Sequence, residues 1–128
     1  MTMQEPFKPY PRDLLPRGFR YPQRYLNFAE TGEYPAIYPW WFIDAESEVG
    51  RLAYEVGRLE NAMLVPFAKI DDSAGDIACF DGNDSTGNPR IIMLITDGSG
   101  RAYSFNDFDD WLSAATRDAT SRGASIEV

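Results

Sequence analysis

The sequence predicts an α+β fold, a single domain in which a small antiparallel β-meander sheet is packed with surrounding helices. Short apolar segments that alternate with Gly- and Asp-containing turns fill residues 62–105, as expected for a meander. Apolar residues recur at helical spacing before and after that region, as expected for amphipathic helices. A chain of 128 residues, of which 44% are hydrophobic, is sufficient for one core.

The N-terminal part of the chain is rich in proline. Five prolines lie within residues 1–22, and they exclude a regular helix or a central strand there. We therefore divide the chain into a Pro-rich N-terminal arm, residues 1–21, and an α+β domain, residues 22–128. The composition of the arm is compatible with an extended segment that wraps the surface and with a partly ordered tail.

A short helix is predicted over residues 22–31. Pro22 suits the first turn of a helix, and Gly32 suits its end. The aromatic residues of this segment recur at helical spacing: Tyr21, Tyr25 and Phe28.

Trp40 and Trp41 lie in the connector or short strand that follows, EYPAIYPWWFID. Neighbouring residues of an extended chain point to opposite faces. We therefore expect one Trp to enter the core and the other to lie at a binding surface, where exposed Trp is favoured. The alternative is that both pack internally, because Trp buries a large area.

A second helix is predicted over residues 44–62, with Asp44 as its N-cap. The pentapeptide EVGRL occurs twice, at residues 48–52 and 55–59. Two copies are too few for a coiled coil, so the repeat indicates one amphipathic helix. Its apolar stripe comprises Ala45, Val49, Leu52, Ala53, Val56 and Leu59.

Four strands make the predicted meander: residues 62–70, 76–80, 90–96 and 101–105. Pro66 places the first strand at an edge of the sheet or gives it an irregular start. The third strand is apolar on both faces, so we expect it to be central and covered on both sides. The tetrapeptide DGSG, residues 97–100, indicates a tight hairpin before the fourth strand.

A last helix follows the sheet. Ser104 with Asp107 resembles a capping box, and the acidic residues beyond them favour the positive start of a helix. Gly123 is predicted to end this helix. The stripe expected to face the core comprises Phe105, Phe108, Leu112 and Ala115.

Twenty acidic residues outnumber twelve basic ones, which gives a formal charge of −8. Phosphate binding needs clustered Lys and Arg, so we expect no nucleic acid and no anionic membrane as partner. An acidic surface suits a basic partner protein, or it serves solubility alone. The sequence has no apolar run of membrane-spanning length and no apolar signal-peptide segment, so we expect a cytoplasmic protein.

The sequence contains no histidine and a single cysteine. The usual general base and the usual zinc ligand are therefore missing. Cys79 is expected to be a small core residue rather than a nucleophile. No cofactor is expected, because the glycine motifs lack phosphate-binding spacing. The acidic loop beginning at Asp81 superficially resembles a calcium-binding loop. It holds Thr86 and Ile92 where such a loop needs Gly and Glu, so we expect no metal site there.

Four carboxylates flank the first predicted hairpin: Asp71, Asp72, Asp76 and Asp81. Paired carboxylates carry out acid–base chemistry when their separation suits it and their environments are unequal. The sequence fixes neither condition, and Asp is also an ordinary turn former. A role in chemistry and a role in the turn therefore both stay open.

Short motifs follow one another in a distinctive order between residues 63 and 112. They are Pro66-Phe67-Ala68, Gly75-Asp76, the apolar strand from Ile91 to Ile95, and Ser104-Phe105 ahead of Phe108 and Leu112. This order resembles the SUKH superfamily, the Smi/Knr-type group of fungal cell-wall-assembly regulators and bacterial toxin-immunity proteins. The sequence departs from the family in its Pro-rich opening and its short first helix, which ends at Thr31-Gly32.

The resemblance implies an α+β fold without catalytic function, and bacterial members are mostly immunity proteins that bind and neutralise a toxin. We therefore expect a non-enzymatic protein-binding module whose partner is a protein such as a basic toxin domain. The alternative is a small-molecule-binding protein or a histidine-free enzyme that uses the hairpin carboxylates. The candidate partner-binding residues are Trp40, Trp41, Asp71, Asp72, Asp81 and Asp84.

Overall fold

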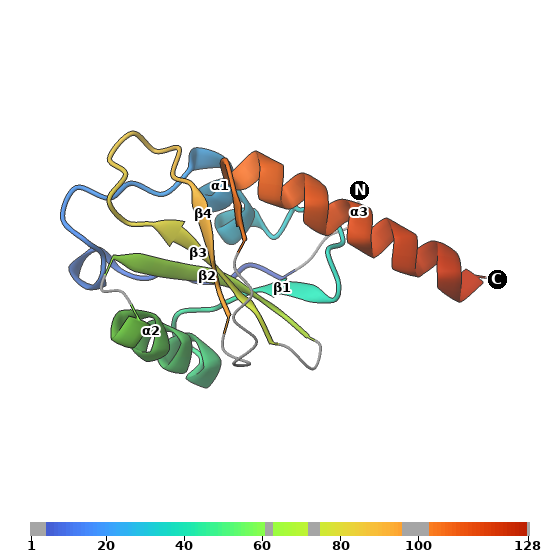
Figure 1. Ribbon diagram of the computed structural model, residues 1–128, viewed down its shortest axis with the longest axis horizontal. Coiled ribbons are helices and arrows are strands. Elements are labelled where there is room, and N and C mark those ends of the chain that lie inside the picture. The colour runs from blue at the N-terminus through green and yellow to red at the C-terminus, as the bar shows by residue number, and fades with distance from the viewer. Residues whose placement is uncertain (1–4, 61–62, 72–74, 96–102, 128) are drawn as a thin grey trace.

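The computed structural model describes residues 5–60, 63–71, 75–95 and 103–127, with the side chains of the last segment described as far as Arg117. Within these residues it confirms the predicted α+β fold, one small domain with a five-stranded antiparallel sheet. The strand order β1-β2-β3-β4-β5 follows the chain, so the sheet is a meander. Helices α1 and α3 cover one face of the sheet and α2 covers the other (Figure 1).

The elements occur along the chain as follows: η1 (Arg12–Leu14), α1 (Gln23–Thr31), β1 (Trp40–Phe42), α2 (Glu48–Glu60), β2 (Leu64–Ile70), β3 (Ile77–Asp81), β4 (Ile91–Leu94), β5 (Ser104–Phe105) and α3 (Phe108–Glu127). The predicted first helix is confirmed. It ends at Gly32, whose φ of 72° is the left-handed conformation that favours glycine.

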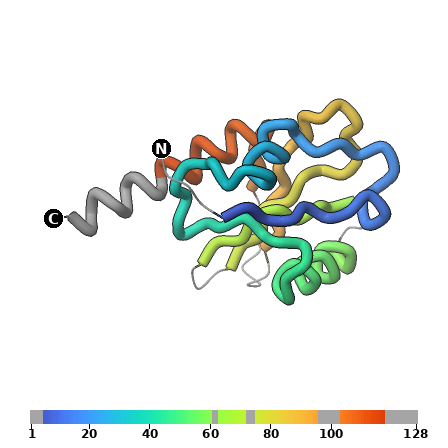
Figure 2. The backbone as a smooth tube through the Cα atoms, turned by 180° about the vertical axis from the view of Figure 1, so that it is seen from behind, coloured from blue at the N-terminus to red at the C-terminus, as the bar shows by residue number. Residues whose placement is uncertain are grey.

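The Pro-rich arm contributes side chains to the core. Phe7, Tyr10 and Phe19 are buried. The Phe7 N–H donates to the Ala29 carbonyl of α1 at 3.0 Å, and the Phe7 ring stacks on Phe42 of β1 at 5.0 Å. Figure 2 shows this segment, in dark blue, running between α1 and α2. From residue 5 onward the arm is therefore part of the packed domain.

Helix α2 begins later than predicted, and its N-cap is not Asp44. The Ser47 hydroxyl accepts the Gly50 N–H at 3.0 Å, which makes Ser47 the capping residue. Asp44 instead closes the preceding turn, because its carboxylate accepts the Glu46 N–H at 2.8 Å.

The buried face of α2 includes only part of the predicted apolar stripe, namely Ala53, with Val56 half-buried against the same cluster. The buried residues are Gly50, Ala53 and Gly57, whereas Leu52 and Leu59 are 60% and 87% exposed. At Gly50 the helix lies so close to the turn beneath it that a Cβ would be 2.0 Å from the Asp44 carbonyl oxygen. The helix is therefore amphipathic, but its largest apolar side chains point to solvent.

The strand that contains Pro66 is interior, so of the two predicted alternatives the edge is wrong and the irregular start is the one observed. β2 pairs with β1 on one side and with β3 on the other. The register shifts between Pro66 and Ala68, and such an irregularity accommodates a residue without an N–H. The prediction that the third strand is central is confirmed, because β4 lies between β3 and β5. The predicted DGSG hairpin lies outside the described residues.

Helix α3 has boundaries that differ from the predicted ones. The Asp107 carboxylate accepts the Asp110 N–H at 2.9 Å, so Asp107 is the N-cap. Ser104 belongs to β5, and its hydroxyl accepts a hydrogen bond from Arg90 at 3.0 Å. The helix continues through Gly123, so the predicted end there is wrong.

Trp111 of α3, which is not part of the predicted apolar stripe, is the largest of the fully buried side chains of the described residues. Its ring meets Phe67 of β2 edge-on at 4.9 Å, and Phe67 in turn stacks on Phe80 of β3 at 4.2 Å. The predicted stripe around it is confirmed, with Phe108, Leu112 and Ala115 buried and Phe105 half-buried.

Candidate partner-binding surface

The structure does not bring the six predicted partner-binding residues together. Asp71 follows β2 directly, and Asp81 ends β3, where it pairs with Leu64 at the start of β2. Asp71 lies seven positions beyond Leu64 along β2, so the two carboxylates lie roughly 20 Å apart along the hairpin. Asp72 lies outside the described residues. The predicted set is therefore divided between the two ends of one hairpin.

The two tryptophans point to opposite faces of the sheet, as predicted. Trp40 is 6% exposed and meets the Trp111 ring edge-on at 5.5 Å, within the cluster beneath α1 and α3. Trp41 is half-buried and packs with Val56 against the smaller cluster beneath α2. Trp40 is therefore a core residue, and of the two only Trp41 presents a substantial surface to solvent.

Trp41 belongs to a surface that we call the aromatic end. This surface comprises Tyr34, Tyr38, Trp41 and Asp71. Tyr38 is 67% exposed, the most exposed aromatic side chain of the described residues. Tyr34 is half-buried, and its burial together with the nearby Glu5 carboxylate raises the pKa of its hydroxyl. Tyr34, Tyr38 and Trp41 border one hollow of about 220 Å³.

Backbone hydrogen bonds fix the aromatic end. The Trp40 N–H donates to the Ile37 carbonyl at 2.8 Å, which closes a turn around Tyr38 and the cis peptide before Pro39. The Asp71 N–H donates to the Pro39 carbonyl at 2.7 Å. An exposed carboxylate therefore lies beside the exposed aromatic segment, although 30 residues separate them in sequence. Sequence reasoning missed Tyr38, and the only local signal was the repeated aromatic-proline pattern YPAIYPWW.

Asp81 and Asp84 are turn-forming residues at the other end of the hairpin. The Asp81 carboxylate accepts the Asn83 N–H at 2.9 Å. The Asp84 carboxylate accepts the backbone N–H groups of Thr86, Gly87 and Asn88 at 3.0–3.2 Å. Both side chains are half-buried, and these local bonds satisfy much of their accepting capacity. Their structural role is clear, and they lie apart from the aromatic end.

The remaining hairpin groups occupy unlike environments. Asp71 is exposed, whereas Asp76 is 4% exposed and accepts a 2.7 Å hydrogen bond from the Tyr103 hydroxyl. Cys79 is fully buried, as predicted, and burial raises the pKa of its thiol, which keeps it protonated and unreactive. Among the described residues, no three His, Cys, Asp or Glu side chains are grouped to hold a metal ion.

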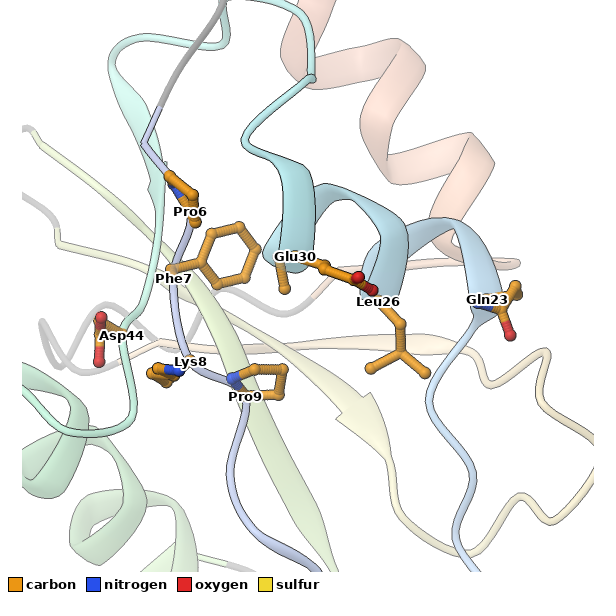
Figure 3. A pocket seen from close by; sticks show the side chains of 9 residues that line it. Pro6, Phe7, Lys8, Pro9, Gln23, Leu26, Glu30 and Asp44 are labelled. Atoms are coloured by element: carbon orange, nitrogen blue, oxygen red, sulfur yellow. The ribbon is translucent and has the colours of Figure 1, made fainter.

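A larger hollow of about 520 Å³ lies between the arm and α1 (Figure 3). Phe7, Pro9 and Leu26 form apolar walls, while Lys8, Glu30 and Asp44 bring charges of both signs to its rim. This hollow could not be predicted from the sequence, because its shape depends on how the arm packs against α1. Its mixed charges select no single class of ligand.

The fold and these surfaces define a small acidic α+β domain with an antiparallel meander between helices. Residues 13–114 match the SMI1 / KNR4 family (SUKH-1), and the chain therefore belongs to this family. The predicted membership of the SUKH superfamily is confirmed. The family includes toxin immunity proteins and consists generally of non-catalytic immunity and regulator domains. No curated protein and no solved structure matches the chain.

The family match includes α1, α2 and all five strands, and it begins within the predicted arm. None of the described helices combines the length and the apolar composition needed to cross a bilayer.

Proposed function

We propose that the chain is a non-enzymatic protein-binding module, an immunity protein that binds and neutralises a basic toxin domain in the cytoplasm. The observation that carries this proposal is the aromatic end. Tyr38 is 67% exposed there, beside the half-buried Trp41 and the exposed Asp71. Tyr and Trp are enriched among the residues that dominate binding energy at protein interfaces.

Charge supports a basic partner. The formal charge of −8 gives the protein a negative field that steers a positively charged partner and speeds association. At the aromatic end, the exposed Asp71 would pair with a Lys or Arg at the rim of such an interface. Membership of a family that includes immunity proteins supports the same function.

The test begins with the toxin genes that neighbour the gene for this chain. Co-expression of the chain with such a toxin domain is expected to protect cells, and the purified pair is expected to bind tightly and to weaken as salt is added. The double variant Tyr38→Ala/Trp41→Ala is expected to weaken binding at least about tenfold, which is about 1.4 kcal/mol.

Leu14→Ala is the matched control, because it removes an exposed apolar side chain from η1 instead. It is expected to bind like the wild type. The proposal fails if no neighbouring toxin exists and a native lysate yields no tight, salt-sensitive partner. A toxin that binds the double variant as tightly as the wild type would remove the aromatic end from the interface.

A further inference from the structure

One side of α2 carries an apolar seam that the described residues bury only in part. We call it the α2 stripe, and it comprises Val49, Leu52, Val56 and Leu59. Leu59 is 87% exposed, Leu52 is 60% exposed and Val49 is 37% exposed, while Val56 is half-buried. Their spacing of three and four residues matches the a and d positions of two heptads. Single exposed leucines are ordinary, but a contiguous exposed apolar seam marks an interaction site.

The orientation of α2 is fixed by its opposite face. A Cβ added at Gly50 would lie 2.0 Å from the Asp44 carbonyl oxygen, so no larger residue fits there. The Tyr10 hydroxyl also donates to the Gly50 carbonyl and ties the helix to the arm. The helix therefore cannot rotate to bury its leucines, and the described residues leave most of the stripe uncovered.

Within α2, the charges nearest to the stripe are negative. At 3.6 residues per turn, Glu48, Glu55 and Glu60 lie roughly 60–80° from its centre, whereas Arg51 and Arg58 lie roughly 120–140° away. All three glutamates are exposed.

Both arginines are held on the far side of the helix. Arg51 donates to the Glu46 carbonyl at 2.9 Å, and Arg58 donates to the Tyr54 hydroxyl at 3.0 Å while its guanidinium lies over the Tyr54 ring. The stripe is therefore apolar with an acidic border on both edges.

We propose that the α2 stripe docks an amphipathic helix of the partner protein, with apolar residues at heptad spacing and Lys or Arg beside them. This inference rests on the proposed function, for which it specifies the partner's contact element. A basic helix complements the acidic border. A second copy of the chain would bring Glu55 against an equally acidic border and would join two molecules of charge −8, so it fits less well.

The α2 stripe adjoins the surface already described. Val56 of the stripe and Trp41 of the aromatic end both pack on the cluster between α2 and the sheet. A docked helix would thus lie on the side of the sheet on which Trp41 emerges, and under this proposal the two surfaces belong to one interface.

The test uses the full chain and a synthetic three-heptad peptide with Leu at positions a and d and Lys or Arg at positions e and g. A scrambled peptide of the same composition lacks the amphipathic pattern. Titration calorimetry is expected to show at least about tenfold tighter binding of the heptad peptide than of the scrambled one. Leu52→Gln/Leu59→Gln is expected to abolish this preference, and Glu48→Gln/Glu55→Gln to weaken binding and its dependence on salt.

Leu14→Gln is the matched control and is expected to bind like the wild type. Gln has nearly the helix propensity of Leu, so circular dichroism is expected to show α2 intact in the variants. Equal binding of the two peptides, or binding that Leu52→Gln/Leu59→Gln leaves unchanged, overturns the proposal. A wild-type dimer that this double variant converts to a monomer in sedimentation velocity also overturns it, because the occupant is then a second copy.

Failure of this proposal is distinguishable from failure of the proposed function. If a neighbouring toxin is neutralised while Leu52→Gln/Leu59→Gln binds it like the wild type, the function stands and the docking helix is wrong. If the heptad peptide binds through the stripe while no toxin is neutralised, the docking helix stands and the immunity function is wrong.

Discussion

Gly50 of α2 packs on the Asp44 carbonyl so closely that a Cβ at residue 50 would lie 2.0 Å from that oxygen. Gly57 occupies the same place in the second EVGRL copy, yet a Cβ there would lie 3.4 Å from the Pro66 ring, an ordinary contact. One short sequence, used twice in one helix, therefore meets two different environments. The difference comes from the chain beneath the helix, a turn in one case and a strand in the other.

These two glycines are expected to respond differently to the same substitution. Gly50→Ala is expected to lower the free energy of unfolding by about 1–3 kcal/mol, because the methyl group meets backbone that must shift. Gly57→Ala is expected to be neutral or to stabilise by up to about 1 kcal/mol, because alanine is the better helix former. Urea denaturation of both variants checks this, and equal destabilisation would contradict the packing described for α2.

Adjacent tryptophans are expected to differ in their contribution to stability. Trp40→Ala is expected to cost about 3–5 kcal/mol, because Trp40 is buried against Trp111. Trp41→Ala is expected to cost clearly less, because part of its side chain stays in solvent. Denaturation followed by far-ultraviolet circular dichroism separates the two. Equal costs would mean that Trp41 is also a core residue.

The hydrogen bond from Tyr103 to the buried Asp76 joins the chain at β5 to the start of β3. Tyr103→Phe is expected to lower the free energy of unfolding by about 1–2 kcal/mol, because a buried carboxylate loses a donor. Tyr38→Phe is the control and is expected to change it by less than about 0.5 kcal/mol, because Tyr38 is largely exposed. If the two variants unfold at the same urea concentration, the Tyr103 bond contributes nothing.

The sequence predicts most of this fold because strands and helices are encoded in local apolar periodicity. Prediction from sequence fails where the pairing or burial of a residue depends on segments that are distant in sequence. Pro66 predicts an edge strand or an irregular start, and only the pairing of β2 with both β1 and β3 decides between them. The burial of Gly50 rather than Leu52 depends on the turn at Asp44, which local periodicity does not describe.

The candidate surface shows the same division. Asp81 and Asp84 were predictable as turn formers, and the structure places them in that role. Trp41 and Asp71 of the aromatic end were predicted as binding residues, but their grouping with Tyr34 and Tyr38 was not. That grouping depends on the Asp71–Pro39 contact, which joins two segments through the pairing of β1 with β2.

Buried groups that carry a proton are expected to make the protein sensitive to alkaline pH. Burial raises the pKa of the Cys79 thiol and of the Tyr10, Tyr21 and Tyr25 hydroxyls above their ordinary values. The folded state keeps these protons at a pH where the unfolded chain releases them. The unfolded state then binds fewer protons than the folded state, so the free energy of unfolding falls as pH rises.

The ordinary pKa values set the pH window of this loss. The contribution of these groups is complete below about pH 8, and the loss begins near pH 8.5 with Cys79 and steepens near pH 10 with the tyrosines. Above its ordinary pKa, each group is expected to lower the free energy of unfolding by about 1.4 kcal/mol for every pH unit. In urea denaturation at a series of pH values, Cys79→Ala is expected to remove the part of the slope between about pH 8.5 and 10. A free energy of unfolding that stays constant from pH 8 to about 10.5 would contradict the burial of these four side chains, because their protons could then not differ between the folded and unfolded states.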